Sequence, residues 1–209
     1  MGVCKIISSG SHGNAVLLHD SILFDIGVPF SMIKPYMYQI QVVLISHVHS
    51  DHININTLRK LQFERPSLRI IVGVHMLELL EGFKNIDIFD VGKLYDYGEF
   101  QISAVKLYHD VPCFGWRVFK GDHKTFFATD TYTLEGITAK GYNLFLIEHN
   151  YNEDTINQSI EAAQARGEYS HQRGSFNSHL SEQQARDFIF KNKGEKYEVL
   201  RLHESSTQL

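Results

Sequence analysis

The chain has 209 residues, enough for one sizeable domain or at most two small ones, and the composition of an ordinary globular protein. No apolar run approaches the roughly 20 residues needed to cross a bilayer, and the N-terminus "MGVCKIISSG" lacks the features of a signal peptide. The net charge of −4 argues against a strongly basic surface, and two cysteines do not make a disulfide framework or a thiolate zinc site. We therefore expect a cytoplasmic protein without membrane contact.

Short apolar runs separated by Gly- and Asp-containing turns predict strands in the first half of the chain. These predicted strands cover residues 3–10, 14–20, 21–27, 41–46 and 68–73. Residues 31–40 contain Pro35 and predict irregular structure or a short interrupted helix. Helical spacing of apolar residues predicts helices at 56–64 and 74–83.

The second half of the chain is predicted to form several successive strands, then two helices and a final strand. Strands are predicted at residues 86–92, 94–109, 115–121, 124–130, 142–150 and 197–206. Helices are predicted at 152–166 and 180–192, and Ser181 with a glutamine three residues later forms a capping box for the second. This order suits an α/β fold in which two sheets pack face to face with helices outside, an αββα four-layer sandwich forming a single domain over residues 1–209.

Polar residues immediately follow the apolar run in five of these predicted strand segments. They are Asp25, His47, Asp130, Glu148 and His203. Strand ends that meet at one edge of a rigid scaffold can hold a reactive group of side chains. We therefore expect these residues to belong to one site.

The segment "LISHVHSDHI" places His47, His49, Asp51 and His52 within six positions, in a chain with twelve histidines. A neutral imidazole offers one lone pair to a metal, and a carboxylate adds negative charge. On a turn, His47 and His49 can point the same way and share one ion. Asp51 and His52 are then free to bind a second ion. A solvated histidine-rich loop is the alternative, which the mixed, interleaved residue types disfavour.

"HVHSDH" matches the His-x-His-x-Asp-His signature of the metallo-β-lactamase superfamily, whose fold is the αββα sandwich. "ILFDIG" resembles the first motif of that family, which implies that Asp25 orients the metal-binding turn. "VKLYHD", "FFATDT" and "LRLHES" resemble the third, fourth and fifth motifs. The resemblance thus covers nearly the whole chain.

The resemblance implies two metal sites and a ligand set for each. The first ion would be held by His47, His49 and His109, and the second by Asp51, His52 and His203, with Asp130 bridging both. His149, His171 and His179 compete with His203 for the last position because all of them follow Asp130. Zinc is expected because imidazole dominates the ligands, and manganese and iron remain open alternatives.

"LIEHNY" and "SHLS" resemble the phosphodiesterase branch of the superfamily, including the tRNA 3′-processing endonucleases and short bacterial nuclease-like members. "GSHGNAVLL" is similar to a loop of the latter. In that branch a glutamate and a histidine, here Glu148 and His179, assist proton delivery to the leaving group. Asp51 would both bind the second ion and accept a proton from the attacking water.

The predicted function is a dinuclear metal-dependent hydrolase that cleaves nucleic acid ends or nucleotide diesters with a hydroxide bridging two ions. A carboxyl ester, lactone or thioester hydrolase of the same fold is the alternative, and a metal-binding module without turnover is a third. The expected partner is a nucleotide or short nucleic acid. Arg173 would contact a substrate phosphate or form a structural salt bridge. The sequence leaves a homodimer as an open alternative to a monomer.

Overall fold

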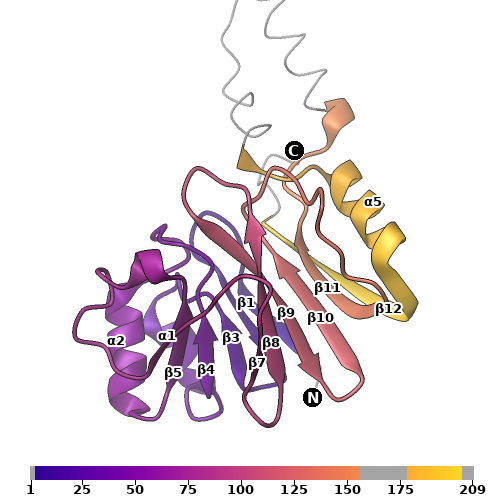
Figure 1. Cartoon of the computed structure of the whole chain (residues 1–209). Helices are drawn as coiled ribbons and strands as arrows, with labels where there is room; N and C mark the ends of the chain where they lie inside the picture. The colour runs from indigo at the N-terminus through magenta and orange to yellow at the C-terminus, as the bar shows by residue number, and fades with distance from the viewer. Residues whose placement is uncertain (1–2, 156–177, 204–209) are drawn as a thin grey trace, which may run out of the picture. The chain divides into compact units, whose positions relative to one another are not determined.

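A computed structural model of the chain describes residues 3–155 and 178–203 (Figure 1). The chain divides into two compact units, residues 1–90 and 91–209, and each unit holds one six-stranded sheet. Most of the predicted helix at 152–166, together with His171 and Arg173, lies outside the described residues.

The sheet of the first unit follows the order of the chain, β1-β2-β3-β4-β5-β6. Its strands are Cys4–Ser8, Ala15–Leu18, Ile22–Phe24, Val42–Leu44, Arg69–Val72 and Ile86–Ile88. The first three strands pair antiparallel, and the pairs from β3 to β6 are parallel. Strands β2, β3 and β4 are buried along their whole length, which explains their continuous apolar sequence.

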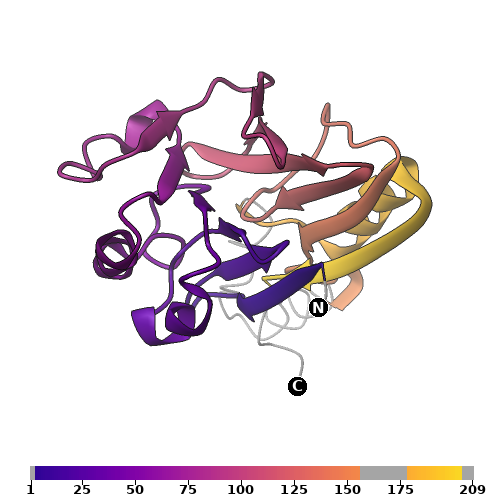
Figure 2. The ribbon, with the colours of Figure 1, turned by 90° about the horizontal axis from the view of Figure 1, so that it is seen from below.

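The first unit also contains α1 (Phe30–Ile33), the 3-10 turn η1 (Lys34–Tyr36) and α2 (Ile55–Glu64), which lie beside the sheet in Figure 2. The Oδ1 atom of Asn54 accepts a hydrogen bond from Thr57 N (3.1 Å) and caps α2. Leu58 and Leu61 of α2 enter the apolar core of the unit.

The predicted helix at 74–83 is wrong: only a 3-10 turn, η2 (Val74–Met76), forms there, followed by further turns. The apolar spacing is real, because Met76 and Leu80 are both buried. The backbone bonds nevertheless mostly join residues three apart, such as Leu77 N to Val74 O (3.2 Å). No side chain caps the segment at Gly73.

The sheet of the second unit has the order β12-β11-β10-β9-β8-β7. Strands β7 to β12 are Leu94–Asp96, Gln101–Leu107, Cys113–Lys120, His123–Ala128, Tyr142–Glu148 and Lys193–Leu202. Strands β7 to β10 form antiparallel hairpins, whereas the pairs β10–β11 and β11–β12 are parallel.

Helix α5 (Glu182–Asn192) lies against the β11–β12 end of this sheet (Figures 1 and 2). The predicted capping box is confirmed: Ser181 Oγ accepts from Gln184 N (3.0 Å), and Gln184 Oε1 accepts from Ser181 N (2.9 Å). Phe188 and Ile189 pack into a core cluster that includes Phe145 of β11. Among the described residues, no helix is both long enough and apolar enough to cross a membrane.

Polar residues stand at the carboxyl ends of strands in both units, as predicted. Asp25 follows β3 in the first unit, and in the second Asp130 closely follows β10 and His203 directly follows β12. These three buried residues have positive φ angles of 56°, 53° and 51°. A left-handed backbone is uncommon outside glycine, and such residues concentrate at functional sites.

Candidate metal centre

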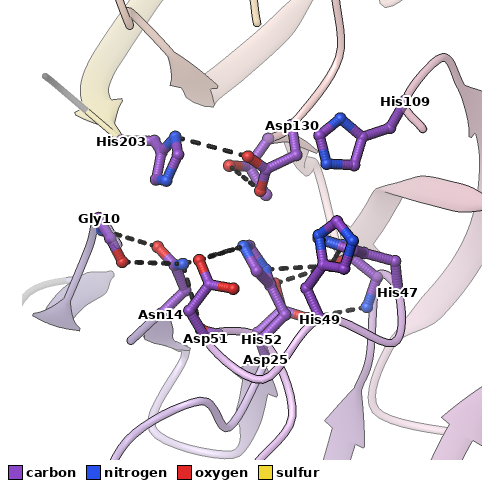
Figure 3. A network of polar contacts seen from close by, with 12 residues as sticks. Gly10, Asn14, Asp25, His47, His49, Asp51, His52, His109, Asp130 and His203 are labelled. Atoms are coloured by element: carbon purple, nitrogen blue, oxygen red, sulfur yellow. Dashed lines mark hydrogen bonds and ion pairs between the residues drawn. The ribbon is translucent and has the colours of Figure 1, made fainter. Parts of the chain in front are cut away.

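Asp25 ties the end of β3 to the histidine-rich turn of the first unit (Figure 3). Its carboxylate accepts hydrogen bonds from Ser46 N (2.7 Å), Ser46 Oγ (3.0 Å) and His52 Nδ1 (2.8 Å). Asp25 is fully buried, so these three donors replace the water that its charge would otherwise bind. The carboxylate therefore fixes the turn on which the metal-ligand candidates lie.

The same network sets the tautomers of two histidines. Because Ser46 gives its hydroxyl proton to Asp25, its oxygen accepts from His47 Nδ1 (2.9 Å). His52 likewise donates from Nδ1 to Asp25. Both rings are left with their lone pair on Nε2, the arrangement in which an outer partner prepares a histidine to bind a metal.

His47 and His49 converge as a chelating pair would. His47 Nε2 lies 3.1 Å from His49 Nδ1. Two nitrogens on one tetrahedral zinc, each about 2.0–2.1 Å from the ion, stand about 3.3 Å apart. The pair therefore fits a shared divalent ion with little rearrangement.

Asp51 and His52 lie on the next part of the turn, beside the Gly10–Asn14 loop (Figure 3). The Asp51 carboxylate lies 3.6 Å from His52 Nε2. Asn14 Nδ2 donates to Asp51 O (3.2 Å) and lies 2.9 Å from His52 Nε2. Asn14 in turn accepts at Oδ1 from Gly10 N (2.9 Å). The loop thus supports the turn from a second side.

The second unit holds its own cluster of possible ligands. The ligand atoms of its four members all lie within 4.8 Å of one another, and the members are Asp130, Glu148, His179 and His203. This mixture of imidazoles and carboxylates is the donor set that zinc, manganese and iron accept.

Glu148 is the centre of this cluster and is fully buried. Its Oε1 atom lies 2.5 Å from His179 Nδ1 and 3.3 Å from His203 Nδ1. Its Oε2 atom accepts from the backbone N–H of Thr131 (3.2 Å). A carboxylate buried without such partners would strongly destabilise the unit. The contact between Glu148 and His179 is therefore part of what allows this carboxylate to be buried.

Backbone pairing explains how His179 reaches Glu148 from a distant part of the sequence. Asn150 N donates to Leu180 O (3.1 Å), and Glu182 N donates to Tyr151 O (2.8 Å). The segment before α5 is thereby held against the residues that follow β11. His179 directly precedes Leu180, so the first of these bonds brings it next to Glu148.

Opposing effects act on the pKa of His179. Burial by itself lowers this pKa, but the hydrogen bond to Glu148 and the charges of Glu148 and Asp130 outweigh burial and the neighbouring His203. The pKa of His179 is therefore raised above its usual value, and the imidazolium is favoured.

Asp130 and His203 face each other in the second unit, 3.5 Å apart between Oδ1 and Nδ1 (Figure 3). Thr129 Oγ1 donates to Asp130 Oδ2 (3.2 Å), and Asn150 Nδ2 donates to His203 O (3.1 Å). Both residues are thus held by the strand ends next to them.

His109 lies on the loop after β8 and donates from Nδ1 to Ser178 O (3.2 Å). Its Nε2 atom lies 3.1 Å from Asp110 Oδ1, a contact in which the carboxylate can only accept a proton from Nε2. His109 and His179 are neighbours, with ring centroids 5.9 Å apart. His109 remains in the ligand set that the resemblance implies, and His179 remains a competitor for the last position of that set.

His149, one of the competitors for the last ligand, behaves differently. Its Nδ1 atom bonds to Ile147 O (2.9 Å), and the residue lines a pocket beside α5 together with Ile189. His203 and His179 both contact Glu148, so both remain candidates.

Sequence reasoning assigned no role to four residues of these networks. They are Asn14, Ser46, Thr131 and Asn150, and each directly contacts a predicted site residue. For Asn14 a signal was present in the "GSHGN" loop. The others are ordinary polar residues at strand ends, and only their hydrogen bonds distinguish them.

The Beta-lactamase superfamily domain family matches residues 23–183, which include Asp25 and the whole histidine-rich turn. The chain belongs to this superfamily. No curated protein sequence matches it.

Solved structures show the same fold at low sequence identity. The metallo-beta-lactamase fold protein YhfI from Bacillus subtilis is 20% identical, with a TM-score of 0.75 over 99% of this chain and 87% of YhfI. The short form of human tRNase Z (ELAC1) is 16% identical, with a TM-score of 0.68 over 98% of this chain and 93% of that one. A diphosphatase from the PhnP family is 11% identical, with a TM-score of 0.65 over 97% and 85%. The predicted metallo-β-lactamase fold is confirmed.

Proposed function

We propose that this superfamily member is a metal-dependent phosphodiesterase that cleaves nucleic acid ends or nucleotide diesters. The observation that carries the proposal is the buried Glu148 carboxylate 2.5 Å from His179. Two of the structural neighbours are by name a tRNase and a diphosphatase, which supports a phosphorus-centred reaction.

The proposal includes two divalent ions, with zinc preferred because imidazoles dominate the ligand candidates. The motif resemblance assigns these ligands to His47, His49, Asp51, His52, His109, Asp130 and His203. The tautomers of His47 and His52 support this assignment, because each keeps a lone pair on Nε2. Bound ions would supply positive charge for the phosphoryl oxygens and lower the pKa of a coordinated water.

The protein groups have separate tasks in the proposed reaction. Asp51, half-buried on the turn, accepts a proton from the attacking water. His179, held as an imidazolium by Glu148, donates a proton to the departing alkoxide. Glu148 keeps the Nδ1–H of His179 fixed, so Nε2 carries the transferable proton.

We further propose that residues 1–209 form one domain in the cytoplasm, since the family match includes parts of both units. The proposed substrate is a nucleotide diester or a short nucleic acid, with no membrane involved. A homodimer is a further hypothesis, which size-exclusion chromatography with light scattering tests directly.

The test is a screen of the zinc- or manganese-loaded protein against bis(p-nitrophenyl) phosphate and end-labelled oligonucleotides. His179→Ala should lower kcat by about 10²–10⁴-fold, the usual contribution of a general acid, and leave the metal content unchanged if His203 is the last ligand. His123→Ala is the matched control, because His123 begins β10 whereas Asp130 follows its other end. Opening of a lactone or thioester without any phosphodiester cleavage would replace this proposal by the ester hydrolase alternative.

A further inference from the structure

A pocket of about 540 Å³ lies between α5 and β12 in the second unit, outside the cluster around Glu148. Arg186 and Phe190 line it from α5, and Tyr197 and Arg201 line it from β12. His149 and Asp187 also reach it. We call this pocket the α5–β12 groove; its volume is within the range of small-molecule sites.

Two aromatic rings of the groove are exposed. Phe190 is 75% exposed and Tyr197 is 40% exposed, although other residues of α5, such as Phe188, are buried. Lys193 Nζ lies 5.3 Å from the ring centroid of Phe190 and 4.6 Å from that of Tyr197. An ammonium close to two exposed rings provides stacking surface and positive charge together.

Positive charge predominates along the groove. Arg186 and Arg201 line it, and Lys193 lies close to both of its aromatic rings; among the described residues that line the groove, only Asp187 carries a carboxylate. Arg201 has a long contact of 3.9 Å with Glu182, and both arginines are exposed. The net charge of −4 belongs to the chain as a whole, so this local excess of cations is a distinct feature.

The groove and the proposed reaction site of the second unit both lie at the ends of β11 and β12. His149 directly follows Glu148, the last residue of β11, and Arg201 in β12 stands two residues before His203, which directly follows that strand. Residues 197 and 201 lie on the same face of β12 because side chains alternate along a strand. From His203 to Tyr197 the strand extends about 20 Å at ~3.3 Å per residue. A flexible chain leaving the site can therefore follow β12 along the groove.

We propose that the α5–β12 groove binds the single-stranded nucleic acid that flanks the scissile phosphodiester. Bases stack on Phe190 and Tyr197, and phosphates contact Arg186 and Arg201. Interleaved cations and aromatic rings are the combination that single-strand-binding surfaces use. This inference rests on the proposed function and names the part of the substrate that the groove recognises.

The experiment measures binding separately from cleavage. A fluorescein-labelled 12-nucleotide single strand is titrated with the full chain in EDTA, and anisotropy gives Kd at two salt concentrations. Arg186→Glu and Phe190→Ala are the groove variants, since both residues are exposed on α5. Lys60→Glu and Phe63→Ala on α2 make comparable changes at exposed positions and serve as matched controls.

Phe190→Ala should raise Kd at least about fivefold, the lower bound for one lost stacking interaction. Arg186→Glu should also raise Kd and should reduce the dependence of Kd on salt, because it removes a phosphate contact. The controls should leave Kd unchanged. Hydrolysis of bis(p-nitrophenyl) phosphate should be unaffected by the groove variants, because that substrate is too small to reach the groove.

Unchanged Kd in both groove variants would overturn the inference, as would equal competition by an acidic peptide or a mononucleotide. The proposed function fails in a different way, by loss of all phosphodiester cleavage in the metal-loaded wild type. If cleavage is absent but the groove variants still weaken binding, the groove assignment stands while the reaction is reassigned.

Discussion

Gly27 lies so close to Asp51 that a Cβ atom on residue 27 would stand 1.8 Å from the Asp51 carbonyl oxygen. The same atom would lie 2.7 Å from His52 N. Since no real contact is that short, a side chain at position 27 must push the histidine-rich turn away. The turn that carries the metal-ligand candidates therefore depends on a glycine from the neighbouring strand end.

Gly27→Ala should displace the Asp51–His52 peptide and destabilise the protein by about 1–3 kcal/mol, as overpacking commonly does. Zinc content after metal loading, measured by plasma mass spectrometry, should fall together with the urea midpoint. A variant that binds the full amount of zinc at wild-type stability would show that the turn has room to move.

Asp25→Asn should weaken metal binding by about 10–100-fold, the usual effect of altering a partner that orients metal-binding histidines. The amide retains an acceptor for Ser46 N but loses the charge that fixes the protons of Ser46 and His52. Competition with a chromogenic chelator gives the affinity. Asp87→Asn is the control, because this carboxylate pairs with Arg69 at the surface; equal losses in both variants would contradict the orienting role.

Thr131→Val should destabilise the protein by about 1–3 kcal/mol, because the Thr131 hydroxyl accepts from Tyr108 N (3.0 Å) and donates to Thr133 O (2.9 Å) in a buried position. The same change should lower kcat more than it raises KM, since Thr131 N holds Glu148. Thr131→Ser keeps the hydroxyl and should restore both values. If Thr131→Ser does not restore the stability and kcat, the losses in Thr131→Val result from changed packing and not from the missing hydroxyl.

Ser181→Ala should cost about 1 kcal/mol, the typical loss for an N-cap serine. Ser181 Oγ caps α5 and also donates to the Glu153 carboxylate. Urea denaturation measures the loss, with Ser67→Ala at an exposed position as the control. Because Ser181 follows His179 by two residues, kcat should fall as well if the cap positions that histidine.

Burial raises the pKa of Tyr142 to about 12, although the charge of Arg117 opposes the rise. The neutral phenol is therefore favoured in the folded state, and its stabilising contribution is fully present below the unfolded pKa of about 10. This contribution is lost as pH rises from about 10 through about 12. Urea midpoints of the wild type should fall more steeply between pH 9 and 11 than those of Tyr142→Phe. Tyr38→Phe, at a 69% exposed position, should behave like the wild type.

The sequence by itself determined the strands of the two sheets and the residues at their ends. Continuous apolar runs such as "QVVLIS" can only be buried, and the serine-to-glutamine spacing at 181–184 specified the start of α5. The interleaved "HVHSDH" segment indicated metal chemistry because packing does not require those side chains. The spacing of apolar residues gave a wrong helix prediction at residues 74–83, where buried Met76 and Leu80 lie on turns instead of a continuous helix.

Only the tertiary structure decided which distant groups meet. The motif resemblance gave Glu148 and His179 a shared role, but the backbone bonds that bring these residues into contact across 31 positions leave no pattern in the sequence. The same holds for Asn14 beside His52 and for Gly27 against Asp51. Hydrogen bonds between remote segments depend on where the strands end in space, whereas strand and helix formation depends on the spacing of neighbours along the chain.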